Sequence, residues 1–207
     1  MHNELDNMNE ESVRAANRPL RERNRLAFFV GFLREPQQVG SLVPSSRHLE
    51  CRIIEAAELS EARLVVELGP GTGGTTLAIL RQLRPDAKVL TIEMSQHFVN
   101  LLNDIEDPRL INHNGNAENL PEILAKHGLT SPDVVISGIP FSTMPVETGQ
   151  NIVRAIRDNL ADDGRFVAYQ FRCDVSDITT PIMGLPTFST VMRNIPPMRV
   201  YRWRKVG

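Results

Sequence analysis

The sequence predicts an α/β fold in which a seven-stranded, mostly parallel sheet carries helices on both faces. From residue 64 onward, short apolar runs alternate with segments of about ten residues whose apolar positions recur at helical spacing, a pattern typical of parallel strands joined by helices. The last two apolar runs are joined only by Ile195-Pro196-Pro197, which is too short for a helical crossover. The sequence therefore predicts that this final pair of strands is antiparallel.

The individual elements follow from the same periodicities. The predicted strands are residues 64–68, 88–92, 109–113, 133–137, 165–171, 188–194 and 198–205. The predicted helices between them are residues 75–83, 96–105, 120–127 and 146–160. Before the first strand, apolar residues of 19–35 fall at the i, i+3, i+4 and i+7 spacing of one helical face, Pro36 ends that helix, and a second helix is predicted over 46–59.

Three parts of the chain are expected from these changes in character. Residues 1–17 are polar, with four acids and no lysine among the first twelve, and are expected to form a disordered acidic tail. Residues 18–60 are expected to form N-terminal helices that act as a lid over the substrate or contact a membrane. Residues 61–207 form the predicted core.

Composition excludes several classes of protein. The 207 residues are 41% hydrophobic and 23% charged, as in a globular protein, and the net charge of −2 argues against a general polyanion binder. No apolar stretch is long enough to span a membrane and the acidic N-terminus is no signal peptide, so a cytoplasmic protein is expected. Cys51 and Cys173 are interpreted as small buried apolar residues, and nothing near them has the spacing of a metal site, so no metal is expected.

A glycine-rich turn follows the first predicted strand and leads into a helix. Its glycines, in Gly69-Pro70-Gly71-Thr72-Gly73-Gly74, permit a tight turn and let a ligand approach the backbone. The spacing also satisfies the dinucleotide fingerprint. Glu93 at the end of the next strand can bind ribose hydroxyls, whether the cofactor is a dinucleotide or another ribose-containing cofactor. Glu67 favours a cationic cofactor, because a carboxylate beside a pyrophosphate would be repelled. A carboxylate that only braces the loop is the alternative for Glu67.

The same residues carry a resemblance to a known family. Glu67-Leu68-Gly69-Pro70-Gly71-Thr72-Gly73 resembles motif I of the class I methyltransferases, and Ile92-Glu93-Met94-Ser95 resembles their motif II. The resemblance implies a Rossmann-like fold and S-adenosylmethionine as the cofactor. The residues that it implies for cofactor binding are Ser41, Glu67, Gly69, Pro70, Gly71, Thr72, Gly73, Glu93, Met94, Asn116, Ala117 and Ser137. Asn116 is also open to interpretation as an ordinary turn residue.

The segment after the fourth strand bears on the methyl acceptor. Amino-group methyltransferases often carry an Asn/Asp-x-Pro-aromatic tetrad here, and this chain keeps Pro140 and Phe141 but has Gly138 at the polar position. That departure argues against an adenine-N6 enzyme and favours an aliphatic amine. The resemblance implies an acceptor site at Gly138, Ile139, Pro140 and Phe141.

Aromatic faces suit the quaternary ammonium that repeated methylation produces. Phe141 and Tyr201 are the candidates for such a contact, with Tyr201 equally interpretable as a core strand residue. The proton acceptor is left open among His48, Tyr201 and water.

Two further segments resemble the soluble, Rhodobacter-like phospholipid N-methyltransferases of bacteria. They are residues 32–46, with Phe-Leu-Arg-Glu-Pro and Val-Gly-Ser-Leu-Val-Pro-Ser-Ser, and residues 194–202, with Asn-Ile-Pro-Pro and Arg-Val-Tyr-Arg. The resemblance implies methylation of a lipid headgroup amine, of the phosphatidylethanolamine or ornithine-lipid type. The residues at 141–142 and 170–173 depart from the family pattern and leave the headgroup open. An rRNA adenine methyltransferase, a small-molecule amine methyltransferase and a nicotinamide oxidoreductase are the alternatives.

A lipid substrate requires contact with a membrane. Residues 19–35 combine apolar and aromatic side chains, including Phe28 and Phe32, with nearby arginines, and such a helix can lie in an anionic membrane interface. The alternative is a helix packed on the protein's own sheet. We expect a peripheral protein on the inner face of the cytoplasmic membrane that binds no nucleic acid; the oligomeric state is not predicted.

Overall fold

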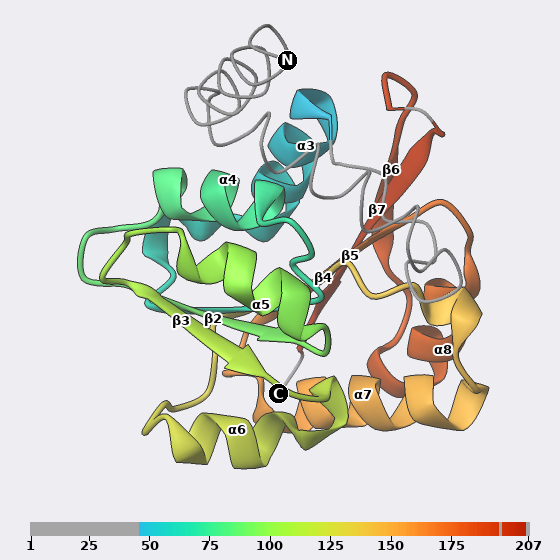
Figure 1. Ribbon diagram of the computed structural model, residues 1–207. Coiled ribbons are helices and arrows are strands. Elements are labelled where there is room, and N and C mark those ends of the chain that lie inside the picture. Colours follow the sequence, from blue (N-terminus) through green and yellow to red (C-terminus); the bar gives the residue numbers. More distant parts are fainter. Residues whose placement is uncertain (1–45, 195, 206–207) are drawn as a thin grey trace, which may run out of the picture. The chain divides into compact units, whose positions relative to one another are not determined.

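A computed structural model describes residues 46–194 and 196–205 and contains a single seven-stranded sheet among them (Figure 1). Its strand order is β3-β2-β1-β4-β5-β7-β6. The strands are β1 Leu64–Leu68, β2 Lys88–Glu93, β3 Leu110–Asn114, β4 Val134–Ser137, β5 Arg165–Gln170, β6 Thr187–Val191 and β7 Met198–Arg204. The first five are parallel, and β7 is antiparallel to both β5 and β6. The predicted sheet and its antiparallel C-terminal pair are confirmed.

Helices flank the sheet on both sides. In Figure 1, α3, α4 and α5 lie over one face, and α6, α7 and α8 lie over the other. They are α3 Arg47–Ala57, α4 Gly74–Gln82, α5 Gln96–Asn103, α6 Leu120–Lys126, α7 Val146–Asn159 and α8 Asp174–Met183, with short 3-10 helices η1 Leu59–Glu61, η2 Ala117–Asn119 and η3 Phe141–Thr143. The sequence did not predict α8, because β-branched residues and an internal proline, Pro181, weaken its helical pattern.

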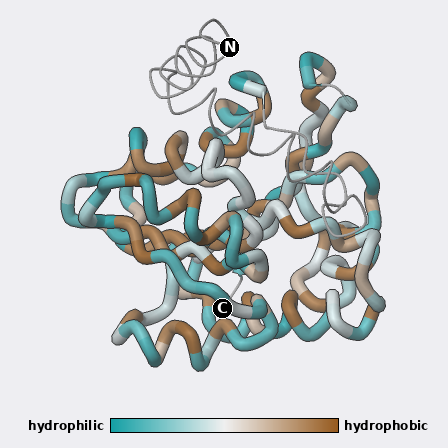
Figure 2. Tube along the Cα trace, viewed as in Figure 1, coloured by the Kyte–Doolittle hydropathy of each residue, from teal (hydrophilic) through white to brown (hydrophobic). Residues whose placement is uncertain are grey.

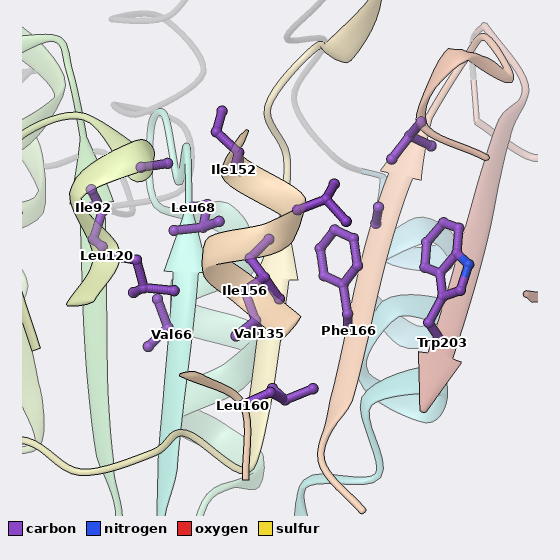
Figure 3. Close-up of a cluster of buried hydrophobic side chains, with 14 of the residues drawn as sticks. Val66, Leu68, Ile92, Leu120, Val135, Ile152, Ile156, Leu160, Phe166 and Trp203 are labelled. Carbon is purple, nitrogen blue, oxygen red and sulfur yellow. The ribbon is translucent and has the colours of Figure 1, made fainter. Parts of the chain in front are cut away.

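The core consists of two apolar layers, one on each face of the sheet. All five residues of β1 are buried, as expected for a central parallel strand. Figure 2 shows the apolar residues running along the strands. On the α6–α8 side the layer includes Phe166 and Trp203, whose rings stack with centroids 5.2 Å apart (Figure 3). On the other side Leu49 and Ile53 of α3 pack among residues of β1, α4 and β5.

The packing bears on the predictions for the two cysteines and for the N-terminal part of the chain. Cys51 and Cys173 are both exposed, so the prediction that they are buried is wrong. Cys51 is exposed on α3, although the nearby Leu49 and Ile53 are buried, and Cys173 lies in the turn before α8. Within the predicted segment 18–60, α3 packs directly on the sheet as part of the core. The predicted tail and the predicted helix at 19–35 lie outside the described residues.

The topology places the site. The chain leaves β1 towards β2 on one side, while β4 pairs with β1 on the other, so the strand order reverses at the carboxyl end of β1. Ligands of open α/β sheets bind at such a reversal. The loop that follows β1 and the segment that follows β4 therefore meet at one edge of the sheet.

Candidate active site

The glycine loop after β1 is held in a conformation that requires glycine. The three glycines at alternate positions of 69–73 have φ between +56° and +80°, in the left-handed region. The Gly69 N–H donates to the carbonyl of Ile92 at 2.9 Å, which ties the loop to the end of β2. Pro70 is buried and Thr72 is half-buried. The loop leads directly into α4, whose first turn leaves backbone N–H groups free for a ligand.

Glu67 is fully buried at the end of β1, directly beneath this loop. Its Oε2 accepts a hydrogen bond from the Thr76 hydroxyl at 2.6 Å, whereas no group of the described residues donates to its Oε1. Burial raises the pKa of Glu67 to about 8 against the opposing effect of the Thr76 hydrogen bond, and the nearby charge of Glu93 adds to the rise. A buried carboxylate with one open oxygen is suited to a positively charged ligand.

Glu93 joins the end of β2 to the glycine loop. Its Oε2 accepts from the Gly71 N–H at 3.2 Å and its Oε1 from the Ser95 N–H at 2.9 Å. Burial raises the pKa of Glu93, although these backbone hydrogen bonds favour the charged form. The next residue, Met94, is 73% exposed, and its contact with a cofactor stays a prediction.

Asn116 and Ala117 lie just after β3, the strand next to β2, at the start of the short helix η2. The Asn116 Oδ1 accepts from the Glu118 N–H at 3.1 Å and its Nδ2 donates to the Glu118 carboxylate at 2.9 Å, so Asn116 caps the short helix η2. Ala117 is buried in the core. The structure thus gives Asn116 the turn role that was its alternative interpretation, and contact of these two residues with a cofactor stays a prediction.

The acceptor segment begins where β4 ends, beside the glycine loop. The Gly138 N–H donates to the carbonyl of Leu68 at 2.9 Å, and the Ser137 hydroxyl accepts from the Ile139 N–H at 3.3 Å. The Ile139 carbonyl accepts from the side-chain amide of Gln170 at the end of β5. These bonds fix the backbone of the segment on both sides.

Two aromatic residues expected at the acceptor are instead part of the core. Phe141 is 1% exposed and packs on the α7–α8 side, and Tyr201 is 3% exposed, with ring centroids 5.7 Å from both Phe188 and Trp203. A cation–π contact needs an open ring face, so the core interpretation of Tyr201 is favoured. Pro140 is half-buried at the edge of the sheet.

The remaining expected residues are more distant or undescribed. His48 is exposed on α3, as its interpretation as a surface residue requires. Ser41 lies outside the described residues. Among those that are described, no group of three histidine, cysteine or acidic side chains is placed to hold a metal ion.

Sequence reasoning missed two buried polar residues at this edge. Tyr169 on β5 lies with its hydroxyl 3.5 Å from that of Thr75, in the first turn of α4. Glu50 on α3 is 8% exposed, and its Oε1 lies 3.6 Å from where a Cβ at Gly74 would be. The sequence signal for Tyr169 was weak. Tyr169 lies near the carboxyl end of a predicted strand, where ligands bind, but its neighbours on that strand lie there too.

Three buried carboxylates, Glu50, Glu67 and Glu93, therefore lie around the start of α4. The hydrogen bonds given above for Glu67 and Glu93 come from a hydroxyl and from backbone N–H groups. Such a set fits S-adenosylmethionine, which carries a sulfonium and an ammonium group, better than it fits a pyrophosphate.

The chain is 30% identical over 194 residues to the ornithine lipid N-methyltransferase of Singulisphaera acidiphila, covering 86% of this chain and 95% of that protein. The family model described as "Ribosomal RNA adenine dimethylase" matches residues 44–127, which include the glycine loop, Glu93 and Asn116 but end before β4.

Solved structures show the same fold. The O-methyltransferase TomG of Streptomyces achromogenes, in complex with SAM, superposes with a TM-score of 0.67 at 15% identity, covering 92% of this chain and 91% of that one. The N-methyltransferase NodS of Bradyrhizobium japonicum WM9, in complex with S-adenosyl-l-homocysteine, superposes with a TM-score of 0.64 at 10% identity, covering 88% and 98%. The expected cofactor is confirmed. This chain belongs to the S-adenosylmethionine-dependent class I methyltransferases, in the family of the ornithine lipid N-methyltransferase of Singulisphaera acidiphila.

Proposed function

We propose that this enzyme transfers methyl groups from S-adenosylmethionine to the headgroup amine of a membrane lipid, of the ornithine-lipid or phosphatidylethanolamine type. The observation that carries the proposal is the similarity to an ornithine lipid N-methyltransferase along 95% of that protein. The rRNA adenine family model, by contrast, matches only residues 44–127, less than half of the chain, and ends before Gly138–Phe141.

The proposed cofactor contacts follow from the described geometry. Glu67 would face positive charge through its open Oε1, Glu93 would bind the ribose hydroxyls, and the N–H groups of the glycine loop would hold the carboxylate end. When bound, S-adenosylmethionine supplies a methyl group that is already activated by the positively charged sulfur. The chain's own task is then to align the acceptor and exclude water.

The acceptor nitrogen must offer a free lone pair. An ammonium group would first have to lose a proton to water or another base. Its nitrogen lone pair could then take the methyl group that S-adenosylmethionine would supply, with neutral S-adenosylhomocysteine as the leaving group. The backbone at Gly138–Pro140 would guide the nitrogen, since its position is fixed from β1 and β5.

A contact with a bilayer at this edge is supported by the exposed side chains. Four of the six exposed large apolar side chains among the described residues lie in the connections that follow strands at the carboxyl edge of the sheet or at the start of the next helix: Met94, Val146, Phe171 and Met192. The exposed Arg193 and Arg199 lie at the same edge and suit anionic lipid. None of the described helices is long and apolar enough to cross a membrane.

The N-terminal segment would add to that contact. The Ser46 N–H donates to the Asn194 side chain at 3.1 Å, so the chain enters the described fold beside the β6–β7 turn. We propose that residues 19–35 and this edge bind the membrane together, which makes the enzyme peripheral. Replacing Arg21, Arg23 and Arg25 by Glu should reduce sedimentation with phosphatidylglycerol vesicles; unchanged sedimentation would contradict this part of the proposal.

A partition assay tests the substrate class. The enzyme is incubated with methyl-labelled S-adenosylmethionine and a mixture of vesicles, ribosomal RNA and soluble aliphatic amines, and the three fractions are separated. The vesicles contain phosphatidylglycerol with ornithine lipid or phosphatidylethanolamine. Label in the lipid fraction supports the proposal. Label in RNA would support the alternative that the matched family model suggests, and label in the soluble fraction a small-molecule enzyme.

A further inference from the structure

Gly138 stands where a side chain has no room. A Cβ at this position would lie 2.9 Å from Cζ of Tyr169 and 3.0 Å from the carbonyl oxygen of Gly69, and closer still to the Tyr169 hydroxyl. Real Cβ atoms essentially never come as close as 2.9 Å to a ring carbon, and an approach of 3.0 Å to a backbone oxygen is tighter than most that occur. The polar side chain that related tetrads carry at this position is therefore excluded by Tyr169, and a tyrosine hydroxyl occupies its place.

Tyr169 reaches this point from a different strand. It is the second-last residue of β5, beside β4, and its side chain faces the α3–α4 side of the sheet. Its hydroxyl lies between the end of β4, the glycine loop and Thr75 of α4. The bond to Thr75, at 3.5 Å, is at the outer limit for a hydrogen bond, so the hydroxyl keeps most of its capacity for a closer partner.

We propose that the Tyr169 hydroxyl binds the acceptor nitrogen, in the role that a polar side chain at position 138 has in related amino-group methyltransferases. The inference rests on the proposed function in one respect, that the acceptor is an amine. The hydroxyl oxygen accepts a hydrogen bond from an N–H of the acceptor and turns the nitrogen lone pair towards the methyl group. Tyr169 is then a catalytic residue that the glycine at 138 makes possible.

The surroundings of Tyr169 favour a nitrogen ligand over an anionic one. Glu50, Glu67 and Glu93 act on the hydroxyl electrostatically, and all three are buried carboxylates. Burial, with the charge of Glu67 next in effect, raises the pKa of Tyr169 far above its ordinary value. The group therefore stays a neutral hydroxyl, which can accept a hydrogen bond but does not serve as the base.

A rotating hydroxyl also fits the shape of the acceptor. An amide side chain holds a planar aromatic amine in its own plane, whereas a tyrosine oxygen accepts from a range of directions. Primary and secondary aliphatic amines present an N–H to such an acceptor. A tertiary amine in its nucleophilic form has none, so the hydroxyl contributes to the first and second transfers but not to a third.

The test compares Tyr169→Phe with the wild-type enzyme on acceptors bearing zero, one and two N-methyl groups. The N–H···O bond strengthens as positive charge develops on nitrogen, so we expect kcat/KM to fall about 10- to 100-fold for the first two acceptors. For the dimethylated acceptor and for the Kd of S-adenosylmethionine the change should stay within about threefold. The matched control is Thr179→Val, which removes another buried hydroxyl, on α8, and should leave all of these values unchanged.

A second variant checks the geometry. Gly138→Ala should displace the Tyr169 ring and lower kcat/KM for the unmethylated acceptor, and adding Tyr169→Phe to it should cause little further loss, because the hydroxyl is already displaced.

Three outcomes would overturn the inference: full activity of Tyr169→Phe, an equal loss for all three acceptors, or a parallel rise in the Kd of the cofactor. Failure of the proposed function is distinct, because it appears in the wild-type enzyme as transfer to no amine at all.

Discussion

Replacing Glu67 by Gln should abolish a proton release that accompanies cofactor binding. In the free protein, burial raises the pKa of Glu67 from 4.5 to about 8, so about nine-tenths of the molecules carry a proton on this group at pH 7. A cationic ligand against the open Oε1 favours the carboxylate, and the proton leaves. Binding at pH 7 should therefore release about 0.9 proton from Glu67, falling to about 0.1 at pH 9.

The same shift sets the pH dependence of affinity and of stability. Below pH 8, affinity for S-adenosylmethionine should rise by about tenfold per pH unit, with a plateau above pH 8. In the free protein, the unfolded state loses this proton near pH 4.5 while the folded state keeps it to about pH 8. Glu67 therefore lowers the free energy of unfolding as pH rises between these values, by a total on the order of 5 kcal/mol.

Isothermal titration calorimetry in buffers of different ionisation enthalpy measures the protons released. Glu67→Gln keeps an acceptor for the Thr76 hydroxyl but cannot titrate, so its binding should release no proton through this group and its stability should vary less with pH. Glu61→Gln, at an 85% exposed side chain, is the control and should behave as the wild type. Equal proton release by wild type and Glu67→Gln would refute the reasoning.

Three further predictions concern local geometry and stability. Gly69→Ala introduces a side chain at φ +68° with its Cβ 3.1 Å from Ile139, whereas Gly128→Ala, at φ +61°, places its Cβ in open space. Gly69→Ala should therefore lose more cofactor affinity, measured by calorimetry, and more stability, measured by urea unfolding, than Gly128→Ala. Glu58 caps α3 at φ 49°, so Glu58→Gly should be more stable than Glu58→Ala by about 1 kcal/mol in urea unfolding. Asn194→Ala should lower the free energy of unfolding by roughly 1–3 kcal/mol, because it removes a buried side chain and leaves the part-buried Ser46 N–H at the start of α3 without its partner; an unchanged urea midpoint would contradict this.

The features that could be predicted from sequence are those encoded locally. Each strand and most helices follow from periodicity, and the glycine loop follows from residues that are contiguous, with Glu67 directly before it. The antiparallel end could be predicted because the connection through Pro196 and Pro197 is short. In α8 the local signal was weak, since β-branched residues and Pro181 favour other conformations.

The features that could not be predicted depend on which strands become neighbours. Gly138 could be recognised as a departure from a motif, but its reason lies on β5, in Tyr169. The burial of Tyr201 likewise depends on the place of β7 between β5 and β6, where its ring meets that of Phe188 on β6. Contacts between residues so far apart in sequence become visible only when the order of strands is known.

The central claim is that the acceptor is a lipid headgroup amine. The most direct measurement incubates the wild-type enzyme with S-adenosylmethionine carrying a deuterated methyl group and vesicles of phosphatidylglycerol with ornithine lipid or phosphatidylethanolamine, and then fragments the recovered lipids by mass spectrometry. We predict labelled methyl groups on the headgroup nitrogen of one or both lipids. Cofactor binding by calorimetry without label on either headgroup, or label found only on added ribosomal RNA, would contradict the account.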